Sequence, residues 1–520
     1  MKFVPMVNPH KPPTKTVHIA IGFFFLVNYI VGVGFLGIPK SFSTAGFFPS
    51  FFTLVAISFC AWTTSTWLIE VVSRAQALED LTPPNRNTAC LTPPTPNFRL
   101  DADRNTYTPW FLSFSLFSAL WAYGTVAGSA WAINLPLTFG PFNMCIESDF
   151  DDLPVPGETP CASSYRFCVF LFAVIVIPLS LLDLREQSIV QTVLGIARFT
   201  LIGSIVLYCM AKMIQDATEP AYSSARNYSR NYTQEIESFS ITGWMGSIPI
   251  FLLAQTLQPG LIALTHPIKQ KKHMHWLLLA VFIVSSTFYI TMGTVVSLWF
   301  GDETENTATL NWVPYTTSEN SVQLRMLSYL IVLFPSLDVC TTYPLLVCTL
   351  VNNLYLIFTG RDTSQTKYGY DLWIRLALRA IVSVLPIVCA LLLSNLIYVL
   401  TYSGLATFFN FFFFPAALQL LSQRKCLREF GPRQQSRFID SYNAQEGLES
   451  TPLVPRDPRL GRGPGAASLI SSKASYWTPY SFPVISHPIF VVMVTIVGGV
   501  LFLFSLAGTV LNTVRGDLSL

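Results

Sequence analysis

The sequence predicts an all-α, polytopic membrane protein of about eleven transmembrane helices. Of its 520 residues, 51% are hydrophobic and only 12% are charged, whereas soluble domains carry about 25% charged residues. Apolar runs close to the roughly 20 residues that span a bilayer recur along the chain. Basic residues gather in alternate loops, as the positive-inside rule requires.

The apolar runs divide the chain into two groups of five and a final helix. We expect helices at residues 17–40, 47–72, 109–137, 166–182, 188–213, 243–265, 275–300, 322–358, 372–394, 396–421 and 484–510. The first run follows a polar stretch and is long enough to span, so it is expected to be an uncleaved helix rather than a signal peptide. The first five-helix unit is then 17–213 and the second 243–421.

The charges of the loops predict a cytosolic N-terminus. Lys and Arg lie before the first helix and in the 6–7, 8–9 and 10–11 loops, while the 3–4 and 7–8 loops are acidic. This orientation makes 1–16 and 422–483 cytosolic, and 214–242 and the tail 511–520 extracytosolic.

Two kinds of modification fit the extracytosolic loops. The sequons at Asn227 and Asn231 lie in the 5–6 loop, where glycosylation occurs. Cys145 and Cys161 share the 3–4 loop, where a disulfide and two free thiols both remain open.

Two cytosolic stretches, 77–107 and 426–482, lack apolar periodicity and are rich in polar residues and proline. We expect both to be flexible and to be where regulatory partners bind.

The first predicted helix contains a break signal. Gly32, Gly34, Gly37 and Pro39 fall within eight residues in the middle of the apolar run. Glycine tolerates unwound backbone and proline lacks an N–H donor, so the helix is expected to unwind here. Inside lipid such a break is costly unless the freed groups line a cavity or bind a ligand. A close helix–helix contact is the alternative.

The sixth helix carries a matching interruption at Gln255, Thr256, Gln258, Pro259 and Gly260. An ordinary proline kink is the alternative. However, this helix opens the second group of five, as the first helix opens the first group. Paired interruptions of this kind point to a midplane binding site between inverted repeats.

Several segments resemble the amino acid/auxin permease family, and most closely its transmembrane protein 104 branch. They are VNYIVGVGFLGIPKSFSTAGF, PLSLLDLREQSIVQTVLGIARF, QTLQPGLIALTHPIKQKKH and FPSLDVCTTYPLLVCTLVNN. The resemblance implies a LeuT-like fold of five plus five helices, with discontinuous helices 1 and 6 and an eleventh helix. It also implies amino-acid transport driven by Na⁺ or H⁺, with no other cofactor.

The resemblance implies positions for the substrate as well. The backbone of Gly32, Val33 and Gly34 would hold the carboxylate, and the backbone around Gln255 and Thr256 the amino group.

For the coupling ion, the resemblance implies Asn28 and Thr342, with Thr341 as the alternative hydroxyl. Tyr123 on the third helix is a further candidate for the wall of the pocket.

Two ionisable residues inside the predicted spans are candidates for ion coupling, because charges in a bilayer are costly and commonly functional. Asp338 could carry a coupled proton, or be capped by neighbouring hydroxyls. Arg198 could act as a fixed cation near the ion site, or pair with Glu70 or extend towards the cytosolic face. The run Phe411–Phe414 is expected to face lipid.

The sequence therefore predicts a secondary transporter of neutral amino acids or similar small zwitterions. Helices 1, 2, 6 and 7 would rock against 3, 4, 8 and 9, and the membrane would be the plasma membrane or an endolysosomal one. A sensor or scaffold that uses the same pocket without transport is the alternative. No enzymatic motif, metal-ligand pattern or basic patch for nucleic acid is evident.

Overall fold

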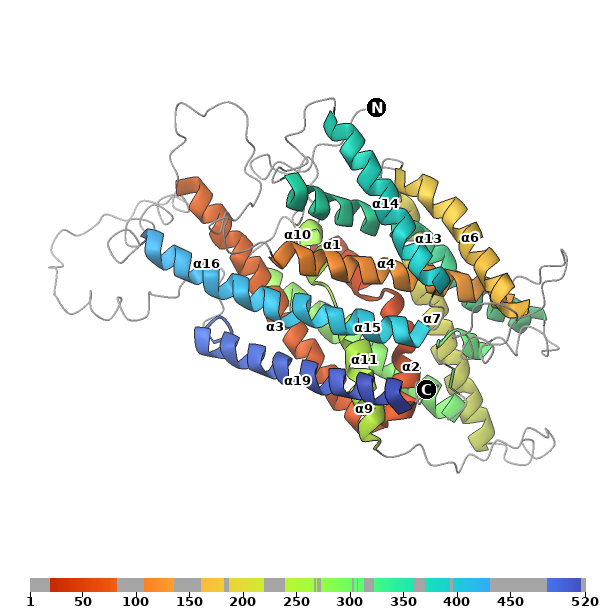
Figure 1. Cartoon of the computed structure of the whole chain (residues 1–520). Coiled ribbons are helices and arrows are strands. Elements are labelled where there is room, and N and C mark those ends of the chain that lie inside the picture. Colours follow the sequence, from red (N-terminus) through yellow and green to blue (C-terminus); the bar gives the residue numbers. More distant parts are fainter. Residues whose placement is uncertain are drawn as a thin grey trace, which may run out of the picture.

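The computed structural model describes residues 19–81, 107–134, 160–181, 187–218, 239–265, 268, 273–301, 304–305, 307–312, 322–359, 370–392, 396–430 and 484–515. Every regular element in these ranges is helical, and no β-strand occurs among them (Figure 1). The all-α prediction is confirmed.

The helices follow the predicted runs in order. The first half contains α1 (Ile19–Ile30), the 3₁₀ turn η1 (Val33–Gly37), α2 (Ile38–Ala45), α3 (Phe47–Leu81), α4 (Tyr107–Asn134), α6 (Pro160–Leu181) and α7 (Gln187–Thr218). The second half contains α9 (Ile241–Ala254), α10 (Gln258–Thr265), α11 (Met274–Phe300), η5 (Leu310–Trp312), α13 (Val322–Thr359), α14 (Tyr370–Leu392), α15 (Leu396–Phe408), the π-helix η7 (Phe409–Phe413) and α16 (Phe414–Phe430). The last helix is α19 (Pro488–Arg515).

The described helices account for the eleven predicted spans. Nine are long and apolar enough to cross a membrane, and the bent pair α1 and α2 makes ten. The eleventh, α4, packs against α6, α13, α14 and α15. Because protein surrounds it, α4 can carry buried serines such as Ser113, Ser115 and Ser118.

The first and sixth spans are both discontinuous. The first bends by 51° between α1 and the helical segment that follows it, and the sixth is interrupted between Ala254 and Gln258. Each opens a group of five spans, so the two breaks occupy corresponding positions in the two halves. The predicted five-plus-five fold with discontinuous first and sixth helices is confirmed.

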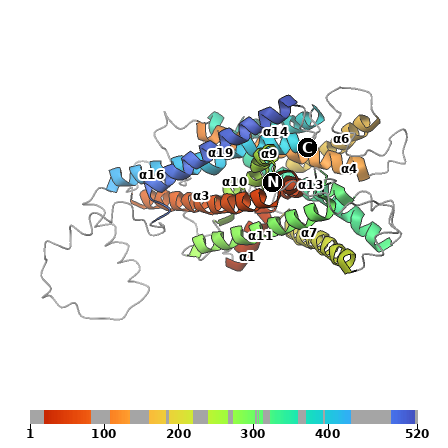
Figure 2. The same cartoon turned by 90° about the horizontal axis from the view of Figure 1, so that it is seen from below.

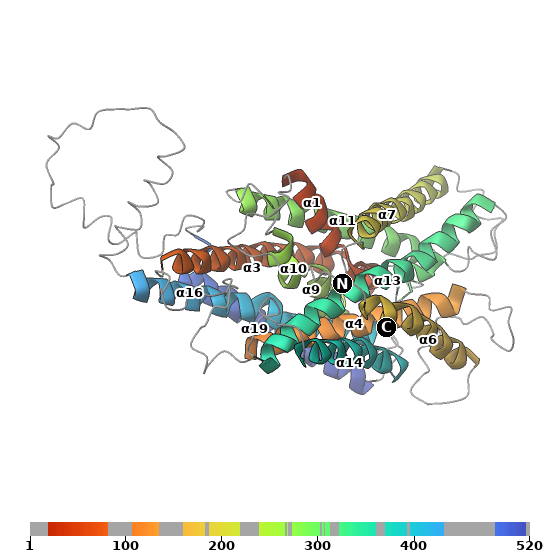
Figure 3. The same ribbon diagram turned by 90° about the horizontal axis from the view of Figure 1, so that it is seen from above.

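The elements are arranged around α3, α4 and α13. Figure 3 shows α1, α11 and α7 along one side, α14 and α6 along the opposite side, and α4 and α13 between them. From below, α3 runs between α11 on one side and α16 with α19 on the other (Figure 2), in agreement with their contacts.

The segment after α11 docks on the second half of the first span. Lys40 Nζ donates to the Thr304 carbonyl at 2.9 Å, and the Ala308 N–H donates to the Leu36 carbonyl at 2.8 Å. These bonds tie the 7–8 loop to η1 and α2.

The prediction that Phe411–Phe414 faces lipid is wrong for Phe411 and Phe412. Phe411 and Phe412 are fully buried, and Phe413 and Phe414 are half-buried. Phe412 is covered by α19, which lies so close that a Cβ on Gly498 would be 2.5 Å from Cγ of Phe412, and the π-helix also contacts α3, α4 and α10. A run of phenylalanines cannot indicate which neighbouring helix covers it.

Candidate substrate and ion site

The break in the first helix is built from unwound backbone around Gly32. Gly32 is extended, with φ −86° and ψ −155°, and its N–H donates back to the Ile30 carbonyl at 2.7 Å. The regular i→i+4 bonding of α1 therefore stops, which releases carbonyl groups on its C-terminal side and N–H groups at the start of η1.

Arg198 on α7 binds the released carbonyls. Its guanidinium donates to the carbonyl of Asn28 at 2.9 Å and to that of Val31, and it forms an ion pair with Asp338 on α13. The first, fifth and eighth spans thus meet at one buried cation. The alternatives in which Arg198 pairs with Glu70 or extends to the cytosolic face do not occur.

Tyr123 of α4 faces the same break. Its hydroxyl is 3.9 Å from the position of a Cβ on Gly32. Thr342, Asp338 and Arg198 all lie near the Tyr123 side chain. Thr342 also donates to the Asp338 carbonyl of its own helix at 3.1 Å. The structure therefore brings Tyr123, Thr342, Asp338 and Arg198 together beside Gly32.

The Asn28 side chain lies against α7. A Cβ on Gly195 would be 2.5 Å from the Asn28 Oδ1, and this buried oxygen has no hydrogen-bond partner among the described residues. The first span therefore offers its Asn28 backbone carbonyl to Arg198 and packs the side chain on the fifth span.

At the sixth-helix break the glutamine side chains turn towards α3 and α11. Gln255 is fully buried, and its amide bonds to Ser285 and Ser286 at 3.2 Å each. Gln258 donates to Thr64 of α3 at 3.0 Å, and its Oε1 accepts from the Leu257 N–H. These contacts fix the broken segment and leave its backbone as the part available to a ligand.

The two breaks touch each other. A Cβ on Gly34 would lie 2.7 Å from the Ala254 Cα, so only glycine fits between the two backbones. Tyr289 of α11 reaches both breaks with its hydroxyl. Tyr289 gave no signal in the sequence, since it lies inside an apolar run that shows no interruption.

Some predicted positions lie outside the described residues: Cys145, Asn227, Asn231 and the side chains of Cys161, Val33 and Thr341. The disulfide and the glycosylation sites stay predictions.

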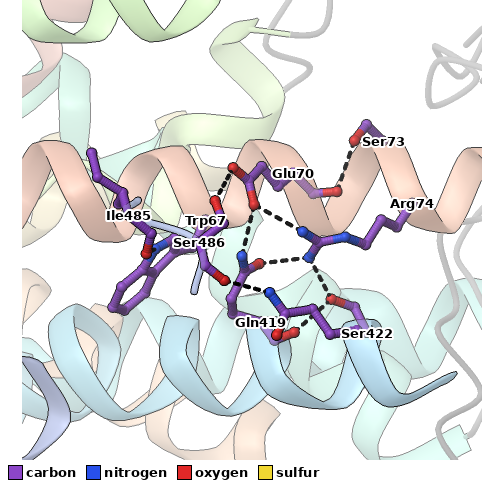
Figure 4. Close-up of polar contacts among 9 residues, drawn as sticks. Trp67, Glu70, Ser73, Arg74, Gln419, Ser422, Ile485 and Ser486 are labelled. Carbon is purple, nitrogen blue, oxygen red and sulfur yellow. Dashed lines mark hydrogen bonds and ion pairs between the residues drawn. The ribbon is translucent and has the colours of Figure 1, made fainter. Parts of the chain in front are cut away.

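A second buried polar network lies towards the far end of α3 (Figure 4). Arg74 pairs with Glu70 at 2.9 Å and donates to Gln419 and Ser422 of α16 at 2.8 and 2.9 Å. Gln419 donates in turn to Glu70 at 2.7 Å. The second and tenth spans are thus joined by charges that are almost wholly buried.

The same network holds the turn that precedes α19. Ser486 donates to Glu70, Gln423 donates to the Ser486 carbonyl at 2.6 Å, and Trp67 donates to the Ile485 carbonyl at 3.1 Å. Residues 484–487 are therefore anchored between the second and tenth spans (Figure 4). We call these contacts the α3–α16 network.

Two interrupted helices that meet within a multi-pass helical protein are typical of integral membrane transporters. Residues 15–442 match the family described as "Transmembrane amino acid transporter protein". The chain belongs to that family. It is a membrane transporter and not an enzyme.

The relatives agree with the branch suggested by the motifs. The chain is 23% identical over 390 residues to a transmembrane protein 104 homolog of Caenorhabditis elegans, covering 70% of this chain and 73% of that one. It is 20% identical over 394 residues to transmembrane protein 104 of Homo sapiens, covering 65% and 74%. It is 20% identical to the Drosophila melanogaster homolog, covering 82% and 93%. The resemblance is confirmed.

Among solved structures, the chain is similar to a manganese transporter of Eremococcus coleocola, solved in more than one mutant form. Two of these mutant structures each have a TM-score of 0.40 and 10% identity. The match covers 95% of this chain and 97% of the transporter in the first mutant, and 97% of each chain in the second.

Proposed function

We propose that the protein moves amino acids, or similar small zwitterions, across a membrane by alternating access. The observation that carries this proposal is the contact between the two breaks at Gly34 and Ala254. It supports one site at which the backbone of both helices meets a single solute. Backbone N–H groups at a helix start suit a carboxylate, and released carbonyls suit an ammonium group.

The proposed substrate position uses the backbone of Gly32, Val33 and Gly34 for the carboxylate. The backbone at Gln255 and Thr256 takes the amino group, since the Gln255 side chain is already bonded to α11. Tyr123 closes the site opposite Gly32.

The coupling ion in this proposal is H⁺ rather than Na⁺. Arg198 already occupies the carbonyls of Asn28 and Val31, where the resemblance implied a sodium ion. A second cation there would be repelled by the guanidinium at close range in a low-dielectric site. Arg198 cannot release its own proton, so Asp338 is the proposed proton carrier.

The orientation in this proposal has a cytosolic N-terminus and an extracytosolic C-terminus, in the plasma membrane or an endolysosomal membrane. The loop charges support it.

The direct test uses the full chain in liposomes with an inside-negative potential. Uptake of a panel of ¹⁴C-labelled L-amino acids is measured under an imposed pH gradient and, separately, under a Na⁺ gradient. We expect uptake with the pH gradient and no stimulation by Na⁺. Uptake that requires Na⁺ would contradict the ion assignment. Binding of an amino acid without uptake under either gradient would instead favour the sensor alternative.

The Asp338→Asn variant tests the proton carrier. We expect loss of uptake driven by the pH gradient, while exchange of internal for external amino acid persists, because exchange needs no net proton movement. The Arg198→Lys variant is the companion. It keeps the positive charge but loses the planar guanidinium group that donates to two carbonyls and a carboxylate at once. Full pH-driven uptake by Asp338→Asn would exclude Asp338 as the carrier.

A further inference from the structure

Tyr289 connects the two breaks through a single hydroxyl group. Its Oη lies 2.9 Å from the Ile30 carbonyl oxygen and 3.0 Å from the Ala254 carbonyl oxygen, and its side chain is fully buried. Ile30 is the last residue of α1 and Ala254 the last residue of α9. The hydroxyl therefore meets the terminal carbonyl on the N-terminal side of each break.

Neither carbonyl has the i+4 N–H partner that a continuous helix would supply, although the Gly32 N–H donates to the Ile30 carbonyl at 2.7 Å. Within a bilayer no water replaces that partner, so a side-chain donor is strongly stabilising. A tyrosine hydroxyl carries one proton, so it donates to one of the two carbonyls at a time.

The surrounding contacts set the geometry of this link. Gly34 packs directly on Ala254, and Gln255, the next residue, is bonded to Ser285 and Ser286 on the same helix as Tyr289. The first and sixth spans are thus both hydrogen-bonded to α11 at the level of the breaks.

We propose that Tyr289 is a positioning residue that holds the two unwound segments in register, and that its proton alternates between the Ile30 and Ala254 carbonyls. When either half-helix shifts, one bond lengthens while the other keeps the proton, so the breaks remain joined. The inference rests on the proposed transport function, because it concerns the same site. Tyr289 does not touch the solute; it fixes the backbone that does.

Two other tyrosines provide matched controls. Tyr165 donates to the Ala390 carbonyl and Tyr343 to the Ser383 carbonyl, each at 2.8 Å. Both are almost wholly buried; Ser383 lies in the interior of α14, and Ala390 lies in its last turn. Each link joins two helices as Tyr289 does, but neither involves a break.

The first experiment measures backbone hydrogen–deuterium exchange of the full chain in lipid nanodiscs. We expect Tyr289→Phe to accelerate exchange in peptides covering 26–36 and 250–260 together. Tyr165→Phe and Tyr343→Phe should leave both peptides unchanged. Unchanged exchange in Tyr289→Phe, or the same acceleration in all three variants, would overturn the proposal. This readout does not depend on transport, so it separates failure of the proposal from failure of the proposed function.

The second experiment replaces Tyr289 by 4-aminophenylalanine or by 4-fluorophenylalanine. The amino group keeps an N–H donor, while the fluorine of similar size has none. We expect wild-type exchange with the amino side chain and accelerated exchange, or loss of folded protein, with the fluoro side chain. Equal behaviour of the two would overturn the proposal.

The kinetic readout is uptake of a ¹⁴C-labelled mixture of neutral L-amino acids under a pH gradient. Because the backbone that binds the solute becomes misaligned, we expect Tyr289→Phe to raise KM by about tenfold, the change that loss of one hydrogen bond typically produces. The maximal rate should fall less than KM rises, and 4-aminophenylalanine should restore KM. An unchanged KM with a lower maximal rate would contradict a positioning role.

Discussion

Two glycines of the first break differ in the space around them. A Cβ on Gly32 would meet its nearest atoms at 3.8–3.9 Å, which is ordinary contact, whereas a Cβ on Gly34 would meet the Ala254 backbone at 2.7 Å. The φ of −86° at Gly32 suits any residue. Position 34 therefore requires glycine for packing, while position 32 has room for a methyl group.

This difference predicts opposite outcomes for two alanine variants. Gly34→Ala should lower the free energy of unfolding by about 1–3 kcal/mol, the usual cost of overpacking. Gly32→Ala should fold normally and raise KM for uptake, because its methyl group enters the proposed carboxylate position. Thermal unfolding in detergent and liposome uptake measure the two effects.

Gly203→Ala on α7 is the control, because a Cβ there meets nothing within 4 Å. Gly203→Ala should neither lower the free energy of unfolding nor raise KM for uptake. If Gly32→Ala transports with an unchanged KM, the carboxylate does not bind at Gly32.

At the residue scale the sequence indicated part of the proposed site. Gly32, Gly34, Asp338 and Arg198 were identifiable because glycines and charges are conspicuous in an apolar run. The Arg198–Asp338 pairing was not predictable, since it depends on which faces of α7 and α13 meet. Tyr289 gave no signal, because an aromatic residue in an apolar helix resembles any other packed side chain.

At the scale of elements, the α3–α16 network joins the second span, the tenth span and the turn before α19. Its two charges pair with each other: Glu70 bonds to Arg74, and Arg74 also bonds to Gln419. Removing one partner of a buried ion pair leaves an uncompensated buried charge, which destabilises the fold. Removing both partners leaves no such charge.

A double-mutant cycle follows from this arrangement. We expect Glu70→Gln to destabilise the protein by about 3–5 kcal/mol, and the double variant Glu70→Gln with Arg74→Met to recover much of that loss. Thermal unfolding of the purified chain measures both. Arg166→Met, at an exposed position of α6, should change little. Simple additivity of the two single variants would show that Glu70 and Arg74 do not interact.

The positions of the helices along the sequence were largely predictable, but which helices pack against one another was not. Runs of apolar residues indicated each span, and Gly and Pro indicated both breaks. The π-helix at Phe409–Phe413 was not predictable from a row of phenylalanines, and neither was the burial of Phe411 and Phe412, of which Phe412 packs on α19. Such features depend on packing between segments distant in sequence, on which local pattern carries no information.

At the scale of the whole molecule, the tenth span contacts both halves of the predicted rocking mechanism. α15 packs on α9 of the sixth span and on α4 of the third span. The predicted motion of helices 1, 2, 6 and 7 against 3, 4, 8 and 9 stays a prediction. It requires α15 to slide on one of these partners.

The orientation of the whole chain gives a separate prediction. With a cytosolic N-terminus, Asn227 and Asn231 face the lumen during synthesis and should carry glycans. Digestion with peptide N-glycosidase should lower the apparent mass of the protein, and Asn227→Gln with Asn231→Gln should abolish that shift. A wild-type chain insensitive to the enzyme would argue against this orientation.

The π-helix of the tenth span fixes the rotational phase of everything beyond it. A π turn closes i→i+5 bonds and so accommodates an extra residue, while each residue of an α-helix advances by about 100°. If the same five residues formed a regular α-helix in place of the π turn, α16 would be rotated by roughly that angle, which would turn Gln419 and Ser422 away from Arg74. Deleting Phe413 removes the extra residue, so we expect a regular helix that keeps this contact. The π turn, and not only the chemistry of the side chains, thus determines whether the second and tenth spans can lock together.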